Sequence, residues 1–281
     1  MVSLYREISR LFGENGIPDA QFDARCIIKQ VAGKPLECVQ ALNADQETVA
    51  NDMARRRIKG EPLQYILGEW EFFGMRLFVG EGVLIPRPDT ERLVEIVLDW
   101  CRGFENPRII DLCTGSGCIA LALQKMLPGS EVHALDVSPA ALSFAKRNVQ
   151  YHALPVTLHQ ADVLQAPDFG TFDVIVSNPP YLTDAEMQAL QPEIRFEPAS
   201  ALEAGVDGLR FYAGITALWK GTLRPGGLLA FEIGEQQGAA VAGILRQNGF
   251  TGIEVLQDYA HHDRVVVGLR SDCPGNDTPI C

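Results

Sequence analysis

The chain of 281 residues is predicted to form an α/β fold, in which a small helical bundle precedes a doubly wound parallel sheet. Apolar residues recur at helical spacing through the first sixty residues. Residues 63–85 are then rich in aromatic and β-branched side chains punctuated by glycine, a pattern typical of a β-hairpin. From Pro107 onward, short apolar runs alternate with helical segments, which indicates a parallel sheet covered by helices.

The helical part is expected to contain four short segments. Asp19, which follows Pro18, is placed to cap the second segment, and Gly33 is placed to end it. Because isolated helices of this length are marginal in water, we expect them to pack into one bundle. The expected segments are residues 4–16, residues 19–33, a short one after Pro35, and residues 45–60.

Seven apolar runs are predicted to be the strands of the sheet. Helical segments separate the early runs, so these strands should be parallel. The last two runs have no helix between them and should form an antiparallel hairpin. The predicted strands are residues 108–113, 131–137, 155–160, 172–177, 227–233, 251–257 and 264–269.

These patterns divide the chain into four expected parts. Residues 1–62 should form the helical domain, and residues 63–90 should form a β-hairpin linker. Residues 91–270 should form the sheet domain. Residues 271–281 have the composition of a disordered tail.

Composition excludes several classes of protein. The formal net charge is −12, from 24 Lys and Arg against 36 Asp and Glu, so we expect no direct binding to nucleic acid. No apolar run approaches the ~20 residues of a membrane span, and the N-terminus lacks a signal-peptide pattern, so we expect a cytoplasmic protein without membrane contact. The seven cysteines are scattered, which indicates neither a metal site nor a disulfide framework.

A glycine-rich loop follows the first predicted strand of the sheet. Gly115 and Gly117 permit a tight turn and a close approach of a ligand to the backbone. A helix that starts near Ser116 directs unsatisfied N–H groups toward that ligand. Asp136 ends the second strand, where a carboxylate accepts hydrogen bonds from both hydroxyls of a ribose. These features predict a nucleoside-cofactor site, and Gly115-x-Gly117-x-x-Ala120 also fits a dinucleotide.

The tetrapeptide Asn178-Pro179-Pro180-Tyr181 follows the strand at 172–177, at the sheet edge where ligands bind. Two prolines remove two N–H donors and leave carbonyl oxygens free, while Asn178 adds a side-chain acceptor and Tyr181 a flat face. A planar amide or amine nitrogen is a weak nucleophile, and acceptors for both of its N–H groups release its lone pair toward a methyl electrophile. The motif therefore predicts methyl transfer to an –NH2 group, whereas an isolated Asn-Pro-Pro would be a turn.

Further segments complete a pattern that extends over nearly the whole chain. They are Gly60-Glu-Pro-Leu-Gln-Tyr-Ile-Leu-Gly, Phe72-Phe-Gly, Leu84-Ile-Pro-Arg-Pro-Asp-Thr-Glu91 and Gly226-Gly-Leu-Leu-Ala-Phe-Glu-Ile-Gly. With the loop at 111–117 and the tetrapeptide at 178–181, the chain resembles the release factor glutamine methyltransferases of the HemK/PrmC type.

This resemblance implies a seven-stranded, Rossmann-like methyltransferase domain after a helical substrate-recognition domain and a β-hairpin linker. It implies S-adenosyl-L-methionine as cofactor, S-adenosyl-L-homocysteine as product, and no metal. It further implies that the partners are class I peptide chain release factors. In these, the glutamine of a Gly-Gly-Gln motif would be methylated on its side-chain nitrogen N5.

The resemblance also assigns roles by position. Asn178, Pro179 and Tyr181 would be catalytic, and Pro180 would join them in binding the substrate amide. Arg87–Glu91 match a family segment close to the site and receive no chemical role. Residues 113–117 would line the methionine part of the cofactor, Asp136 would hold the ribose and Val163 would border the adenine. The cofactor-binding residues implied are Cys113, Thr114, Gly115, Ser116, Gly117, Asp136, Val163 and Asn178.

Two positions depart from the family pattern. Cys113 stands where the family usually has glycine, and a small side chain is tolerated there if the backbone keeps φ below zero. Val163 stands where a bulkier neighbour of adenine is common, which predicts looser stacking of the base.

Other functions remain open at the level of sequence. A ribosomal-protein glutamine methyltransferase would share the catalytic half, and a nucleic-acid exocyclic-amine methyltransferase would use the same acceptors. The acidic charge argues against the latter. A nicotinamide-dependent dehydrogenase would explain the glycine loop and leave the tetrapeptide without a role, and a non-catalytic binding protein would leave the acceptors unused.

Overall fold

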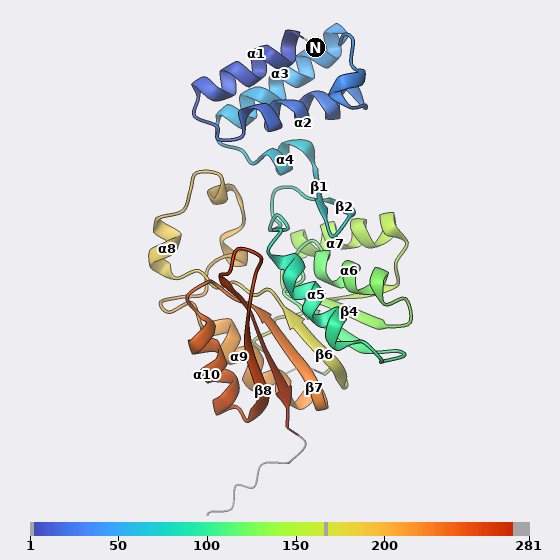
Figure 1. Cartoon of the computed structure of the whole chain (residues 1–281), viewed down its shortest axis with the longest axis vertical. Helices are drawn as coiled ribbons and strands as arrows, with labels where there is room; N and C mark the ends of the chain where they lie inside the picture. Colours follow the sequence, from blue (N-terminus) through green and yellow to red (C-terminus); the bar gives the residue numbers. More distant parts are fainter. Residues whose placement is uncertain (1–2, 166–167, 272–281) are drawn as a thin grey trace, which may run out of the picture.

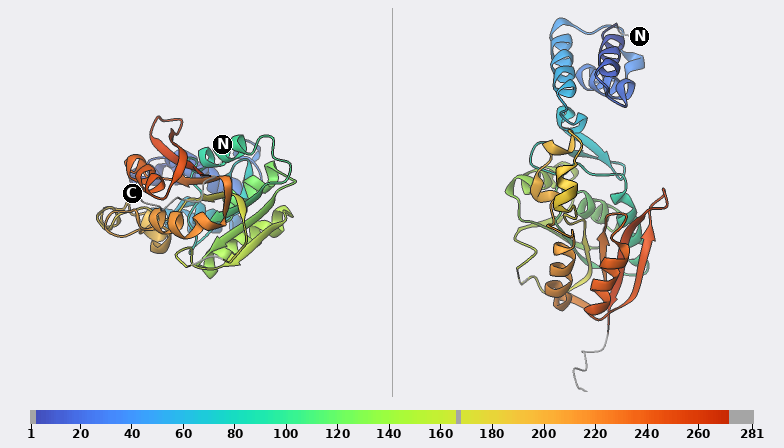
Figure 2. Two further views of the ribbon diagram at one scale, coloured as in Figure 1. Left: turned by 90° about the horizontal axis from the view of Figure 1, so that it is seen from below. Right: turned by 90° about the vertical axis from the view of Figure 1, so that its left-hand side faces the viewer.

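The computed structural model describes residues 3–165 and 168–271, so almost all of the predicted tail lies outside the described residues. The molecule is elongated, with the N-terminal helices at one end, a narrow connector and a larger α/β body (Figure 1). A perpendicular view shows the same separation between helices and body (Figure 2). None of the helices in these described ranges is both long and apolar enough to cross a membrane.

The N-terminal helices form a bundle around one apolar cluster. Leu4, Ile8 and Phe12 of the first helix are buried with Ile27 of the second and Ala50 of the third. This shared core stabilises segments that would be marginal as isolated helices. The elements are α1 (Ser3–Glu14), α2 (Ala20–Ala32), the 3₁₀ turn η1 (Leu36–Cys38) and α3 (Ala44–Ile58).

The ends of these helices follow the predicted signals only in part. Gly33 ends α2 in the left-handed conformation with φ 66°, as predicted. The predicted cap at Asp19 is wrong, because its side chain makes no capping hydrogen bond. The helix α3 begins after Asn43 rather than at Asp45, because Asn43 and Gln46 form a reciprocal capping box.

A helical turn and a hairpin connect the bundle to the body. They comprise α4 (Leu63–Leu67), β1 (Glu69–Phe72) and β2 (Met75–Phe78). The predicted hairpin is therefore present, although a helical turn that ends at Gly68 precedes it. Phe73 and Gly74 both have positive φ and form the tight two-residue turn between the strands. Met75 and Leu77 reach into the core of the body.

The body contains a seven-stranded sheet with the order β5-β4-β3-β6-β7-β9-β8. Strands β3 to β7 are parallel, and the last two strands form the predicted antiparallel hairpin. The strands are β3 (Arg108–Leu112), β4 (Glu131–Asp136), β5 (Val156–Gln160), β6 (Phe172–Ser177), β7 (Leu223–Glu232), β8 (Phe250–Gln257) and β9 (Asp263–Arg270).

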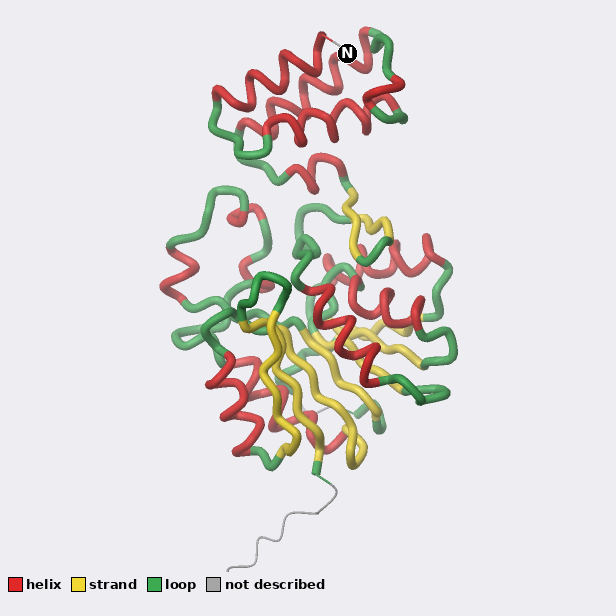
Figure 3. Tube along the Cα trace, in the orientation of Figure 1, coloured by secondary structure: helices red, strands yellow, loops and turns green. Residues whose placement is uncertain are grey.

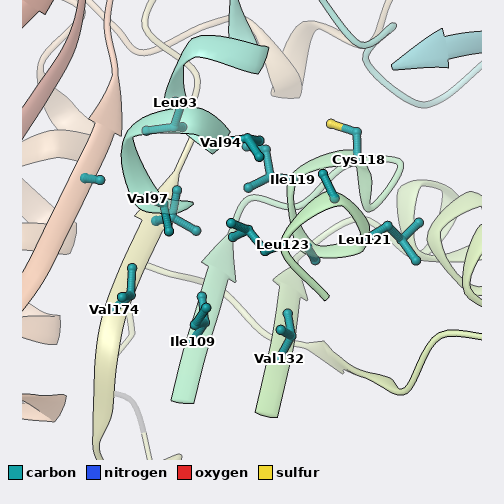
Figure 4. Close-up of a cluster of buried hydrophobic side chains, with 14 of the residues drawn as sticks. Leu93, Val94, Val97, Ile109, Cys118, Ile119, Leu121, Leu123, Val132 and Val174 are labelled. Carbon is teal, nitrogen blue, oxygen red and sulfur yellow. The ribbon is translucent and has the colours of Figure 1, made fainter. Parts of the chain in front are cut away.

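Helices cover both faces of this sheet (Figure 3). Alternate residues of each strand serve opposite faces, so Ile109 joins the core under α5 and α6, whereas Ile110 joins the core under α9 and α10. Figure 4 shows Leu93, Val97 and Leu123 of α5 and α6 above the strands. The helices of the body are α5 (Thr90–Trp100), α6 (Cys118–Met126), α7 (Pro139–His152), α8 (Asp184–Gln188), α9 (Arg210–Trp219) and α10 (Gly238–Gln247); the short turns are η2 (Ile194–Phe196), η3 (Ala199–Ala201) and η4 (Lys220–Thr222).

A buried arginine connects the bundle with a loop of the body. Nε of Arg57 on α3 donates to Oδ2 of Asp23 at 2.7 Å, and its Nη2 lies 2.8 Å from Oε1 of Glu193. The side chains of Arg57 and Asp23 are each only 6% exposed. Burial raises the pKa of Asp23, and the hydrogen bond from Arg57 opposes this shift. The pair thus holds a buried carboxylate that would be unfavourable alone.

We predict that Arg57→Met lowers the free energy of unfolding of the bundle by about 3–5 kcal/mol, because it leaves Asp23 buried without a cation. Arg10→Met is the matched control, since its ion pair with Glu14 is exposed and should contribute about 0.5 kcal/mol or less. Urea denaturation followed by circular dichroism measures both. Equal small losses for the two variants would contradict a structural role for the buried pair.

Candidate active site

A pocket opens at the carboxyl ends of β3, β4, β5 and β6, beside the point where the strand order reverses between β3 and β6. Its residues surround about 850 Å³ of space, which includes open solvent at its mouth. Of the predicted site residues, Gly117, Pro179 and Tyr181 lie outside its lining. Those that line it are Cys113, Thr114, Gly115, Ser116, Asp136, Val163, Asn178 and Pro180.

The loop between β3 and α6 forms one wall through tight backbone turns. Gly115 and Gly117 have φ of 57° and 82°, values that glycine adopts at little cost. The N–H of Thr114 donates to the carbonyl of Leu135 on β4, and the N–H of Gly117 donates to the carbonyl of Thr114. The loop is thereby fixed to the neighbouring strand, with Gly117 capping α6.

The backbone of Cys113 does not meet the condition given for tolerating a side chain at this position. Its φ is 60°, in the left-handed region, rather than below zero. The residue therefore adopts the conformation for which glycine is suited, at a cost of about 1–2 kcal/mol for a side chain. Burial, and secondarily Asp136, raise the pKa of its thiol well above the ordinary value, so the thiol is neutral.

Beneath the loop lies an acid that the sequence analysis did not single out. Asp111 is fully buried, and its Oδ2 accepts from the hydroxyl of Thr114 at 2.5 Å and from the N–H of Ala120 at 3.2 Å. Burial raises its pKa to about 7, with the Thr114 hydroxyl opposing the shift. These bonds tie the loop to the start of α6, so Asp111 supports the pocket from below.

Asp136 ends β4 with its carboxylate oriented by the backbone. Oδ2 accepts from the N–H of Gly115 at 2.8 Å, and Oδ1 accepts from the N–H of Ser138 at 2.8 Å. Burial raises its pKa, and these backbone donors act in the opposite direction. A carboxylate oxygen accepts more than one hydrogen bond, so both oxygens retain acceptor capacity on the pocket side.

The tetrapeptide after β6 forms the opposite wall. Asn178 and Pro180 line the pocket, while Pro179 is buried beside it. Within the described residues, no hydrogen bond is donated to the carbonyl oxygens of Pro179 or Pro180. The carbonyl of Tyr181 instead accepts from Nε2 of Gln237 at 3.0 Å, which anchors the end of the tetrapeptide. Burial raises the pKa of the Tyr181 phenol to about 12, so the phenol is neutral.

Two residues of the quoted family segments lie behind Asn178. Nδ2 of Asn178 donates to Oγ1 of Thr90 at 3.3 Å, and Thr90 is buried at the start of α5. The carboxyl of Glu232, at the end of β7, lies against both side chains and is 2% exposed. The sequence signal for this position is an acid directly after the apolar run at 228–231.

The segment around Thr90 is held in place by charge. Arg87 pairs with the buried carboxylate of Glu197, which also accepts from the N–H of Ile85. Oε1 of Glu91 accepts from the N–H of Phe73 in the hairpin turn at 2.7 Å. These contacts hold residues 87–91 next to the site. The sequence had predicted that this segment lies close to the site but had given it no chemical role.

We predict that Cys113→Gly keeps affinity for the cofactor within about tenfold, or roughly 1.4 kcal/mol, because glycine adopts the same φ without strain. Cys113→Val should weaken binding more, since a β-branched residue at φ 60° is strained further. Isothermal titration with S-adenosyl-L-homocysteine measures both. Loss of binding in the glycine variant far beyond tenfold would show that the thiol itself contacts the ligand.

Comparisons with known proteins agree with this architecture. The family described as methyltransferase small domain matches residues 91–205, and the PrmC N-terminal domain matches residues 3–68. A methyltransferase from Pyrococcus furiosus has the same fold, with a TM-score of 0.53 and 17% identity over 71% of this chain and 91% of its own. A 16S rRNA N2 G1207 methyltransferase (RsmC) from T. thermophilus, in complex with AdoMet and guanosine, has a TM-score of 0.51 and 18% identity over 72% of this chain and 49% of its own.

Sequence relatives are more similar than these structures. The release factor glutamine methyltransferase of Geobacter sulfurreducens is 39% identical over 261 residues, which cover 91% of each chain. Similarity at this level over both the helical bundle and the sheet domain establishes the family. The chain therefore belongs to the release factor glutamine methyltransferases.

Proposed function

We propose that this chain transfers the methyl group of S-adenosyl-L-methionine to N5, the side-chain amide nitrogen, of the glutamine in the Gly-Gly-Gln motif of class I peptide chain release factors. The observation that carries the proposal is the position of Asn178 and Pro180 on the wall of the pocket, where acceptor groups meet the glycine-rich loop. The identity of the substrate protein is inferred from the family to which the chain belongs. A translation factor as substrate fits an enzyme that works in the cytoplasm.

The residues of the pocket suit the proposed cofactor. Asp136 presents oriented carboxylate oxygens for the two hydroxyls of a ribose. Val163 lines the pocket and would border the adenine, and residues 113–116 would hold the methionine part. Asn178 would adjoin the cofactor from the opposite wall. When bound, S-adenosyl-L-methionine supplies an electrophilic methyl group.

The acceptors on the opposite wall make the amide nitrogen a better nucleophile. Oδ1 of Asn178 and the free carbonyl of Pro180 on the pocket wall, together with that of Pro179 beside it, would accept hydrogen bonds from the two N–H groups of the glutamine. These bonds strengthen as the nitrogen becomes pyramidal, so they stabilise the transition state more than the bound substrate. The ring of Tyr181 would hold the amide flat beside them. The methylated nitrogen then releases its proton to water, so no strong base is required.

Choice of the protein substrate is proposed to involve the helical domain. A glutamine on a loop tip offers few contacts, so discrimination between proteins needs a second surface. The contact of Arg57 with Glu193 places the bundle beside the loop that follows the tetrapeptide. The bundle is thus available to bind the release factor outside its Gly-Gly-Gln motif.

We predict that Asn178→Ala lowers the single-turnover rate of release factor methylation by about ten- to several hundred-fold. Losing one or two buried hydrogen bonds at about 1–3 kcal/mol each gives this range. Cofactor affinity should change much less, because the loop and Asp136 are expected to provide most of the contacts with the cofactor. Rapid quench with labelled cofactor gives the rate, and equilibrium binding of S-adenosyl-L-homocysteine gives the affinity.

Asp136→Ala is the matched control for the same experiment, since it should reduce affinity for the cofactor first. A rate near that of the wild type in Asn178→Ala would rule out amide activation by this side chain. Equal losses of rate and affinity would instead make Asn178 a cofactor ligand.

A further inference from the structure

We infer that Thr90 and Glu232 are positioning residues that orient the side-chain amide of Asn178, with its nitrogen toward them and its oxygen toward the substrate. The inference rests on the proposed function and deepens it, because it explains what makes Asn178 an acceptor. An asparagine amide has a donor end and an acceptor end of nearly equal size, so sequence alone does not determine which end faces the pocket.

Three separate elements bring these side chains together. Asn178 follows β6, Thr90 begins α5 and Glu232 ends the adjacent strand β7. Nδ2 of Asn178 lies 3.3 Å from Oγ1 of Thr90, and Glu232 lies against both. Thr90 and Glu232 are each 2% exposed, so water does not replace these contacts. The pocket lies on the other side of Asn178.

Donor and acceptor chemistry favours one arrangement of this group. An ionised carboxylate only accepts hydrogen bonds, so it faces the NH2 end of the asparagine or the hydroxyl of the threonine. The hydroxyl of Thr90 accepts from Nδ2 of Asn178, whereas Oε2 of Glu232 is buried next to this pair with no hydrogen-bond partner among the described residues. The reversed amide would place Oδ1 of Asn178 beside the carboxylate of Glu232, so that two acceptors would compete for the single donor hydroxyl of Thr90. The ionised group therefore holds Oδ1 toward the pocket, where it accepts from the substrate –NH2.

The charge of Glu232 is balanced by its surroundings. Burial raises its pKa to about 7, while Thr90, Arg264 on β9 and Asn178 act in the opposite direction. Asp89, which precedes α5, raises it further. Tyr181 and Tyr212 both lie near Glu232, and the hydroxyl of Tyr212 donates to the main-chain carbonyl of Glu232. A protonated Glu232 is a donor, and it would stabilise the reversed amide by donating to Oδ1 of Asn178.

The test compares Thr90→Val with Thr90→Ser in the full-length enzyme, with an intact release factor as substrate and pH varied from 6 to 9. Thr90→Val removes the hydroxyl that favours the ionised form of Glu232, so the pH profile of the single-turnover rate should shift to higher pH. A shift of one pH unit corresponds to about a tenfold lower rate on the acid side, recovered at alkaline pH. Thr90→Ser keeps the hydroxyl and should keep the profile.

Two further variants separate positioning from packing. Thr216→Val makes the same isosteric change at a buried threonine of α9 and should leave rate and profile unchanged. Glu232→Gln cannot ionise and should remove the dependence of the rate on pH near 7 that is due to this group. Asp111, whose pKa is also about 7, is present in every variant, so differences between variants report on Glu232. Cofactor affinity should stay within about threefold of the wild type in all these variants, since neither Thr90 nor Glu232 lines the pocket.

The outcomes distinguish the inference from the function on which it rests. Absence of release factor methylation by the wild type would overturn the proposed function. Methylation by the wild type, together with an unshifted profile in Thr90→Val, would overturn the positioning role alone. Equal losses in Thr90→Val and Thr90→Ser would also overturn it, because the hydroxyl would then not be the group that matters.

Discussion

The reversal of strand order between β3 and β6 is the constraint on which the site depends. Chain segments leave these two strands toward opposite faces of the sheet, so a crevice opens between them at their carboxyl ends. Parallel strands also bring their last residues to one edge. Asp136 at the end of β4, Asn178 after β6 and Glu232 at the end of β7 therefore lie along the same edge of the sheet although they are far apart in sequence.

The polar groups at this edge are held by partners of fixed hydrogen-bonding character. The two oxygens of Asp136 accept from backbone N–H groups, and the amide of Asn178 donates to a buried hydroxyl. Buried polar groups are expensive to leave unpaired, so each bond restricts the orientation of its partner. The glycine-rich loop that faces these polar groups is strained at one residue, because the backbone of Cys113 is in the left-handed conformation.

Much of the fold could be predicted from periodicity. The apolar runs at 108–113 and 172–177 coincide with β3 and β6 within one residue, because strands covered on both faces are apolar throughout. Local capping was harder to predict, since Asn43 rather than Asp45 caps α3, through hydrogen bonds with Gln46 that depend on local geometry. The residues on the pocket wall could be predicted because the glycine-rich loop and the tetrapeptide are motifs that directly follow a strand. The chemical roles given to these residues stay predictions.

Other features could not be predicted because they are long-range contacts. Thr90 and Asn178 are separated by 88 positions in sequence, and no periodic pattern relates them. The φ of Cys113 depends on how the loop is fixed to Leu135, a residue of the neighbouring strand. Side-chain composition predicts which groups are available in a site, whereas their partners follow from the packing of the sheet.

The central claim is that the acceptors after β6 activate a glutamine side-chain amide for methyl transfer. The most direct measurement incubates the protein with isotopically labelled S-adenosyl-L-methionine and a class I release factor, a ribosomal-protein fraction and an RNA in parallel, and then locates the label by mass spectrometry. The account predicts a single methyl group on the side-chain nitrogen of the glutamine in the Gly-Gly-Gln motif. Label on a ribosomal protein or on a base of the RNA, with none on that glutamine, would contradict it.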